Sequence, residues 1–474
     1  MTTMTLDRPG SALLDLPRGR AWRHALAGRS VTVVGLARSG VAACRLLRAL
    51  GARVTGTDAR TAAALAPEAR ALQTEGVRLV VDGHPPEAFA GAELVIVSPG
   101  VPIEQPALAE CRARGVPVLG EIELAYRTMT AEFVAITGTN GKTTTTALTG
   151  ALLAESGRPV LVGGNIGRPL AAEALDFPAD GWVVAEVSSF QLETTDAFRP
   201  HVAAVLNITP DHLDRHGTLA AYAAAKARIF RAQEASDRAV LNADDPGAAA
   251  LASEVRARLL WFSRRMPVTE GAWVRDEWIT LRLGGRDQAV CPVSEIFLRG
   301  AHNLENVLAA TACAGALGVV PERLRAAIRA FRAVAHRIEW IRERGGVAYY
   351  NDSKATNVDA TLKALTAFQE PIVLIAGGRD KGQHFDALAA AARGRVKAAI
   401  VIGEGRATLG PALRAVTRVE EAASMGEAVR RAAALAVPGD VVLLSPACAS
   451  FDLFRDYEHR GTVFADEVRA LPGP

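Results

Sequence analysis

The sequence predicts an α/β protein built from three domains. Short β-branched runs alternate with alanine- and leucine-rich amphipathic stretches almost throughout, which is the pattern of βα units around parallel sheets. The chain has 474 residues, of which 49% are hydrophobic, and this length exceeds what one core usually serves. We expect domains over 1–125, 126–332 and 333–474, with 1–28 as a mobile extension that carries arginines but no apolar stretch.

The expected elements follow the same alternation along the chain. Strands are expected at 31–34, 53–57, 94–97 and 116–119 in the first domain, then from 133 and at 160–162, 182–187, 203–207 and 239–242, and finally at 347–350, 372–376, 398–402 and 441–444. Residues 278–283 alternate apolar and polar side chains, which predicts an antiparallel strand with one solvated face. A helix is expected at 41–50 and another after residue 303, the segment 321–331 closes the second domain, and the sequence assigns no role to 256–285.

The bulk composition excludes several classes of protein. A net charge of +3 is small for this length and gives no reason to propose nucleic-acid binding. The five cysteines are far apart and have no metal-ligand spacing, which favours a reduced, cytoplasmic protein. No apolar run reaches the roughly 18 to 20 residues that span a bilayer, so membrane insertion is not expected.

A glycine-rich turn after the strand from 133 is the most informative motif. Successive backbone N–H groups at a helix start can bind phosphate oxygens, while a lysine neutralises the outer phosphates and a threonine hydroxyl holds Mg²⁺. Two residues rather than four separate its glycines, so it is a shortened phosphate loop, and a plain helix-capping turn is the alternative. The loop residues are Gly138, Thr139, Asn140, Gly141, Lys142, Thr143 and Thr144.

A second turn, from Gly35 to Gly40, follows the first expected strand and precedes a helix. It occupies the place of a dinucleotide-binding fingerprint, and Asp58 stands near the expected ribose-binding acid. Ala37 replaces the middle glycine, so a helix start that binds another diphosphate is favoured over a dehydrogenase site, and a structural turn is the further alternative. Ser98, Pro99 and Gly100 follow another strand at the same sheet edge.

Three polar side chains follow strands of the central domain. Glu186 ends one strand and suits Mg²⁺, with an ordinary strand-end acid as the alternative. His212 lies in a dense polar segment, where helix capping or phosphate contact is as good an interpretation as metal binding. Lys226 is flanked by alanines, so partial desolvation could make its neutral amine reactive toward CO₂, although a solvated helix lysine is the simpler interpretation.

Taken in order, these motifs resemble the Mur ligase family of ATP-dependent amino-acid-adding enzymes. The similarity runs from about residue 31 to 464, through the phosphate loop, the segments 186–191 and 211–216 with Lys226, and 300–306 followed by His336 and Arg337. Segments 351–357, 377–382 and 444–452 resemble the member that adds D-glutamate. The resemblance implies a Rossmann-like first domain, a central P-loop ATPase-like domain with a mostly parallel sheet, and a Rossmann-like third domain.

The resemblance also implies a mechanism and its cofactors. ATP would phosphorylate the carboxylate of UDP-N-acetylmuramoyl-L-alanine, and the amine of D-glutamate would attack the acyl phosphate, in peptidoglycan precursor synthesis. Lys142 and Thr143 would hold phosphates and one Mg²⁺, while Glu186, His212 and a CO₂-derived carbamate on Lys226 would hold a second. Asn303 and Asn306 would contact adenine, Asp352 the ribose, and Arg337 the phosphates.

The resemblance assigns the two other substrates to the outer domains. The uridine end would lie at Arg38, Ser39, Ala59, Arg60, Ser98, Pro99 and Gly100, and Asn165 would contact the muramoyl group. The D-glutamate carboxylates would be bound by Lys354, Thr356, Lys381, Ser450 and Phe451, with Tyr457 packing nearby. A monomer that closes its third domain upon ATP binding is expected.

Three other functions compete with this one. A folylpolyglutamate synthetase shares the phosphate loop and lysine but does not explain the added first domain. A nucleotide sensor or scaffold would bind ATP without needing Glu186, Lys226 and Lys381 together. A dehydrogenase would bind NAD, which the missing middle glycine disfavours.

Overall fold

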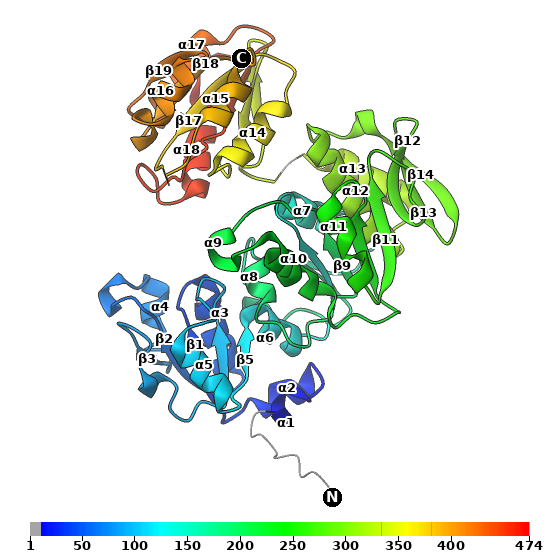
Figure 1. Cartoon of the computed structure of the whole chain (residues 1–474), viewed down its shortest axis with the longest axis vertical. Coiled ribbons are helices and arrows are strands. Elements are labelled where there is room, and N and C mark those ends of the chain that lie inside the picture. Colours follow the sequence, from blue (N-terminus) through cyan, green and yellow to red (C-terminus); the bar gives the residue numbers. More distant parts are fainter. Residues whose placement is uncertain (1–10, 333, 381, 474) are drawn as a thin grey trace, which may run out of the picture. The chain divides into compact units, whose positions relative to one another are not determined.

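The computed structural model describes residues 11–332, 334–380 and 382–473 and contains three β-sheets, each built from a separate stretch of chain (Figure 1). The predicted α/β class with three sheet-based domains is confirmed, because helices alternate with largely parallel strands in each stretch. Among the described residues, no helix has the length and apolar character needed to cross a bilayer.

The first sheet has five parallel strands in the order β3-β2-β1-β4-β5. Its strands are β1 (Ser30–Val34), β2 (Arg53–Thr57), β3 (Arg78–Val80), β4 (Leu94–Val97) and β5 (Val118–Gly120), and its helices are α3 (Arg38–Ala49), α4 (Pro67–Ala71) and α5 (Pro106–Ala113). The strand order reverses at β1, so the carboxyl ends of β1 and β4 flank a topological switch point, where open sheets bind ligands.

The expectation of a mobile extension over 1–28 is wrong for residues 11–28. They form α1 (Ser11–Leu14) and α2 (Arg20–Ala25), and the side chains of Trp22 and Leu26 are fully buried in the core beneath the first sheet. Trp22 and Leu26, four residues apart, anchor the segment to the core. The segment has no long apolar run from which this burial could have been predicted. Residues 1–10 lie outside the described residues.

The central sheet has nine strands in the order β14-β13-β12-β11-β10-β9-β6-β8-β7. Its strands are β6 (Glu132–Thr137), β7 (Val160–Gly164), β8 (Trp182–Glu186), β9 (Val202–Val205), β10 (Arg238–Asn242), β11 (Arg258–Ser263), β12 (Gly271–Arg275), β13 (Trp278–Leu283) and β14 (Arg286–Pro292). Strands β6 to β12 pair in parallel and β12 to β14 pair antiparallel, which confirms the antiparallel strand predicted at 278–283. Residues 256–285, to which the sequence assigned no role, contain β11 and β12 as well as the predicted β13.

The third sheet has six strands in the order β15-β16-β20-β17-β18-β19, with β15 antiparallel at one edge. Its strands are β15 (Glu339–Arg344), β16 (Val347–Asn351), β17 (Ile372–Gly377), β18 (Val396–Ile402), β19 (Arg418–Glu421) and β20 (Val441–Leu444). Buried aliphatic side chains form separate clusters on the two faces of this sheet, as the near-continuous apolar strands require.

Helices complete the central and third domains. They are α6 (Glu121–Thr128), α7 (Lys142–Ala154), α8 (Ser189–Leu192), α9 (Leu213–His216), α10 (Leu219–Ala227), α11 (Pro246–Ala250), α12 (Ala301–Ala316), α13 (Pro321–Ala330), α14 (Val358–Thr366), α15 (Asp386–Ala392), α16 (Leu409–Arg414), α17 (Met425–Leu435) and α18 (Tyr457–Ala470). The chain forms two compact units: one holds 1–293 and 305–328, and the other holds 294–304 and 329–474. The division predicted at 125/126 therefore falls inside α6, within the first unit.

Candidate active site

The phosphate loop connects β6 to α7 and is held from below by Asn207. The Asn207 side-chain oxygen accepts the Asn140 N–H at 2.8 Å, and its amide donates to the Asn140 carbonyl at 3.2 Å. Gly141 has a φ of 82°, and a Cβ there would lie 2.3 Å from the Asn306 side-chain oxygen, so only glycine fits. Thr139, Thr143 and Thr144 are buried beside it. The loop is therefore a preformed ring of backbone N–H groups at a helix start.

Two lysines converge on one carbonyl of this loop. Lys142 Nζ donates to the Gly138 carbonyl at 2.8 Å, and Lys226 Nζ donates to the same oxygen at 2.9 Å. The Lys226 ammonium is 1% exposed and lies 4.4 Å from the centre of the Tyr222 ring. Burial, followed by the charge of Lys142, lowers the pKa of Lys226 well below its usual value. Lys226 is thus a buried amine beside the loop, and the interpretation as a solvated helix lysine is wrong.

Glu186 ends β8 and pairs with Ile136 of β6, two residues before Gly138 of the phosphate loop. One oxygen accepts the Asn165 side-chain amide at 2.7 Å. The other oxygen is buried and has no hydrogen-bond partner among the described residues. A buried carboxylate oxygen without a donor is costly unless a cation or a proton meets it.

His212 lies at the start of α9 with a φ of 51° and a side chain that is 49% exposed. Its ring lies 4.9 Å from the Phe190 ring and 6.5 Å from the Tyr222 ring, and Nε2 is 3.6 Å from an Asp211 carboxylate oxygen. In the part of the chain that the structure describes, no group of three or more His, Cys, Asp or Glu side chains is arranged to hold a metal. Any metal here would therefore also need hydroxyl, phosphate or carbamate oxygens.

The two asparagines predicted for adenine lie on the first turns of α12. The Asn303 amide donates to the Arg299 carbonyl at 2.7 Å, whereas the Asn306 oxygen accepts the Thr145 hydroxyl at 3.2 Å. Asn306 thus also supports the phosphate loop, a contact that the sequence did not predict.

The predicted uridine residues gather at the carboxyl ends of β1, β2 and β4. Arg38 and Arg60 are exposed, and Ser98 donates its hydroxyl to the Gly35 carbonyl at 2.7 Å. Ser39 lies on the first turn of α3, and Ala59, Pro99 and Gly100 lie in the loops after β2 and β4. Asp58 is occupied by its own chain, because it accepts the Leu36 N–H at 2.7 Å and pairs with Arg60, which lowers its pKa strongly. The expectation of a ribose-binding acid at Asp58 therefore has no structural support.

In the third domain, the segments predicted to bind the acceptor meet around one buried arginine. Arg460 Nη1 donates to the Cys448 carbonyl at 3.0 Å, and Nη2 donates to the Ser353 carbonyl at 2.7 Å. Its side chain is fully buried. This residue ties the loop of Asp352 and Lys354 to the loop of Ser450.

The side chains predicted for the acceptor differ in exposure. Ser450 is buried, Phe451 is 61% exposed, and Lys354 Nζ lies 5.3 Å from the centre of the Tyr457 ring. Thr356 is half-buried, and Lys381 lies outside the described residues. Asp352 accepts the Ser445 hydroxyl at 2.9 Å, and burial raises its pKa to about 7.

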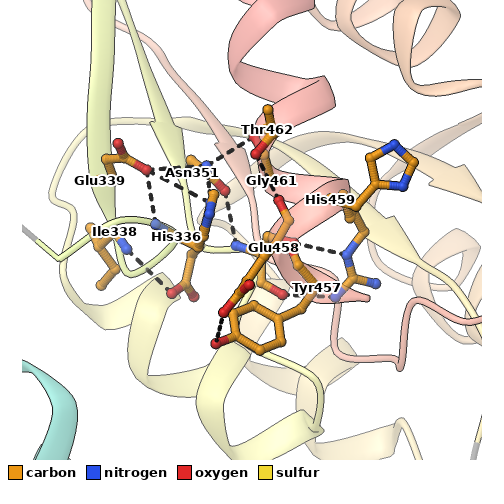
Figure 2. Close-up of polar contacts among 12 residues, drawn as sticks. His336, Ile338, Glu339, Asn351, Tyr457, Glu458, His459, Gly461 and Thr462 are labelled. Atoms are coloured by element: carbon orange, nitrogen blue, oxygen red, sulfur yellow. Dashed lines mark hydrogen bonds and ion pairs between the residues drawn. The ribbon is translucent and has the colours of Figure 1, made fainter. Parts of the chain in front are cut away.

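Asn351 ends β16 and holds the loop of Asp352 and Lys354 through its side-chain amide (Figure 2). Its amide lies 3.0 Å from His336 Nδ1 and donates to Glu339 at 3.2 Å and to the Gly461 carbonyl at 3.1 Å. His336, which has a φ of 66°, accepts the Lys354 N–H on its carbonyl at 3.1 Å. The predicted phosphate-binding residue Arg337 follows immediately, and its charge acts to lower the pKa of Asp352.

Sequence reasoning assigned no role to Arg460, Asn351, Asn207 or Tyr222, although Asn351 lies in the segment 351–357 that it singled out. Three of them act on backbone groups of segments distant in sequence, so no local spacing announces them. Tyr222 lies four residues before Lys226 on one helix, which is a spacing that could have been noticed.

Comparisons with known proteins cover most of the chain. The MurD-like N-terminal domain of Mur ligases matches residues 29–120, the Mur ligase middle domain matches 136–314, and the glutamate ligase domain of Mur ligases matches 336–448. Two solved structures share the fold at 20% identity: a UDP-N-acetylmuramate-alanine ligase from Thermotoga maritima, with a TM-score of 0.58 over 93% of this chain and 99% of that one, and a pseudomurein peptide ligase from Methanothermus fervidus, with a TM-score of 0.56 over 88% and 96%.

Relatives with higher identity extend over nearly their whole length. A UDP-N-acetylmuramoylalanine--D-glutamate ligase of Acidobacterium capsulatum is 49% identical over 450 residues, which is 94% of this chain and 98% of that protein. Proteins of the same name from Koribacter versatilis and Pelotomaculum thermopropionicum are 47% and 48% identical, again over 94% of this chain and 98% of each relative. With three matched domains and these relatives, the chain belongs to the Mur ligase family.

Proposed function

We propose that this chain is an ATP-dependent ligase that joins D-glutamate to the L-alanine carboxylate of UDP-N-acetylmuramoyl-L-alanine in peptidoglycan precursor synthesis. The observation that carries the proposal is the convergence of Lys142, Lys226 and Glu186 on the phosphate loop. The names of relatives at 47 to 49% identity supply the substrates.

The phosphate loop supports transfer of a phosphoryl group without a protein nucleophile. Backbone N–H groups of 138–144 would bind the β- and γ-phosphates of ATP, and Lys142 would turn from the Gly138 carbonyl to neutralise them. The γ-phosphoryl group then passes to the substrate carboxylate, which becomes an acyl phosphate. The D-glutamate amine attacks its carbonyl carbon and releases inorganic phosphate. Positioning and charge neutralisation are what this step requires.

Mg²⁺ fits the oxygens present at this site. The unpartnered Glu186 oxygen is a hard anionic ligand, and the Thr143 hydroxyl stands at the usual metal position of a phosphate loop. Burial lowers the pKa of the Lys226 amine, and its neutral form can react with CO₂, which would give a second anionic oxygen ligand beside Glu186, with His212 completing the set. Bound Mg²⁺ would neutralise the phosphate charge that accumulates during transfer. Two metal positions and the carbamate are part of the proposal.

The remaining roles follow the domains. Arg38, Ser39, Ala59, Arg60 and Ser98–Gly100 would bind the uridine diphosphate, and Asn165 would meet the muramoyl group. Asn303, Asn306, Arg337 and Asp352 would bind the nucleotide. Lys354, Thr356, Lys381, Ser450, Phe451 and Tyr457 would surround D-glutamate. We place the reaction in the cytoplasm, where ATP and the UDP-linked precursor are available, and expect a monomer.

Oxygen transfer tests the acyl-phosphate route. The substrate would be labelled with ¹⁸O in its L-alanine carboxylate and incubated with ATP, Mg²⁺ and D-glutamate, and the released phosphate would be analysed by mass spectrometry. One ¹⁸O atom per phosphate is expected, because the carboxylate oxygen leaves with the phosphoryl group. Phosphate without label, together with ligated product, would exclude the acyl phosphate.

A further inference from the structure

Residues 11–28 form a short helical segment, here called the strap, that lies against the junction between the first and central sheets. The strap precedes residue 29, where the matched first domain begins. Its α1 and α2 bury Leu13, Trp22 and Leu26 in the same core as Ile122, on α6, and Phe133, on β6. The strap therefore shares one core with the helix α6 and the strand β6 that link the two sheets.

Polar contacts from the strap concentrate on α6 and the four residues after it. Gly19 donates its N–H to the Arg127 carbonyl at 2.7 Å, and Arg23 Nε donates to the Thr128 carbonyl at 2.8 Å. Arg18 donates to the Ala131 carbonyl and lies over the Tyr126 ring, 4.7 Å from its centre. The Gly19 N–H and Arg23 thus bond carbonyls in the last turn of α6, which lack partners within the helix.

Arg127 is the centre of this junction and is 2% exposed. It donates to Glu123 at 2.6 Å and to Asp196 at 2.7 Å, while a third nitrogen donates to the Leu14 carbonyl of the strap at 2.9 Å. Glu123 in turn accepts three backbone N–H groups from 196–198, each at 3.0 Å. The strap, the connecting helix and the central domain thus share one buried charge network, which is costly to open.

The strap also reaches the segment that faces the first domain. Arg23 donates to the Ala174 carbonyl at 3.3 Å, just after the turn where Gly167 accepts Arg38. Arg38 belongs to the predicted uridine site, and the neighbouring Asn165 contacts Glu186 near the phosphate loop. The strap therefore contacts both the connection and the segment that follows the turn of Asn165 and Gly167, on which a substrate spanning both sheets would depend.

We propose that the strap is a brace that fixes α6 and so sets the orientation of the first sheet relative to the phosphate loop. This role is separate from catalysis, because the strap contains none of the predicted site residues. Its consequence for substrate binding rests on the proposed function, whereas its effect on α6 does not.

The test compares the full chain with the double variant Arg18→Ala/Arg23→Ala and with a chain lacking residues 1–28. Arg20→Ala is the matched control, because Arg20 is exposed on the same helix. Hydrogen exchange followed by mass spectrometry would be measured for 121–131 and, as an internal reference, for α17. We expect exchange in 121–131 to be about tenfold faster in the double variant and unchanged in the control and the reference.

Kinetics supply the second readout. The KM for the UDP-linked substrate should rise about five- to tenfold in the double variant while the KM for ATP stays within about twofold, because the phosphate loop itself is untouched. Unchanged exchange in 121–131 would overturn the brace, whatever the activity. Faster exchange with an unchanged KM would overturn its link to substrate binding. If the truncated chain does not fold, the double variant alone decides both outcomes.

Discussion

Lys226 Nζ donates a hydrogen bond to the Gly138 carbonyl at 2.9 Å, across 88 positions of sequence. The same carbonyl accepts Lys142 Nζ, so two lysine side chains meet at the first glycine of the phosphate loop. Burial, followed by the charge of Lys142, lowers the pKa of Lys226. Lys226 is therefore placed to act as a buried amine beside the phosphate loop, which a solvent-exposed helix lysine could not do.

Replacing Lys226 tests that role. Lys226→Met should lower kcat/KM by about 10³-fold, because it removes both the buried nitrogen and the proposed carbamate ligand. Lys363→Met is the control, since Lys363 is a surface residue paired with Asp359 on its own helix. In ¹³C-bicarbonate, wild type should give a carbamate NMR signal that the Lys226→Met variant lacks. Near-normal activity of this variant would remove Lys226 from the mechanism.

Glu186 should control the requirement for Mg²⁺. Glu186→Gln replaces the buried, unpartnered anionic oxygen by an amide, so the Mg²⁺ concentration for half-maximal rate should rise at least about tenfold. Initial rates over a Mg²⁺ titration measure this directly. Glu132→Gln, at the exposed amino end of β6, should leave the titration unchanged. An identical curve for Glu186→Gln would contradict a metal at this carboxylate.

Arg460 should act mainly on the acceptor. Arg460→Lys keeps the charge but cannot reach the Ser353 and Cys448 carbonyls with one planar group. We expect the KM for D-glutamate to rise about 10- to 100-fold, equivalent to the loss of one or two charged hydrogen bonds, and the KM for ATP to rise clearly less, because only Asp352 of the proposed nucleotide contacts adjoins the residues that Arg460 holds. Arg469→Lys, exposed on the same helix, is the control. Equal increases in both KM values would indicate general disruption of the domain.

Much of the central domain could be predicted, because the local spacing of apolar and glycine residues indicates its strands, its phosphate loop and its helices. The strand, loop and helix around Lys142 and the placement of Glu186 beside that loop follow from chain order and parallel pairing. Strands β11 and β12 were not predicted, since their side chains alternate poorly and their burial depends on neighbours in the sheet. Arg460 escaped prediction because its partners are backbone carbonyls, which every residue has. The packing of the strap was not predicted because single apolar residues, rather than an apolar run, attach it to the core.

Glu121 should make stability depend on pH. It is buried, accepts the Ala171 N–H at 2.7 Å, and burial raises its pKa from 4.5 to about 7. The folded state therefore binds this proton more tightly than the unfolded state, and stability falls as pH rises from about 4.5 to about 7. The loss amounts to about 3 kcal/mol.

Urea unfolding at pH 5 and pH 8 checks this relation. Glu121→Gln keeps the acceptor but cannot ionise, so its stability relative to wild type should be clearly greater at pH 8 than at pH 5. Glu110→Gln, on the exposed face of α5, should show no such difference. A constant difference between Glu121→Gln and wild type at both pH values would show that Glu121 does not ionise in this range.

The acceptor amino acid is the most direct test of the whole account. Purified protein would be given ATP, Mg²⁺ and UDP-N-acetylmuramoyl-L-alanine with D-glutamate, L-glutamate, L-alanine, L-lysine or diaminopimelate, and phosphate release and ligated product would be measured together. We predict turnover with D-glutamate and none above background with the others. Turnover with a different acceptor would contradict the assignment of the third domain, and ATP binding without any turnover would contradict the ligase itself.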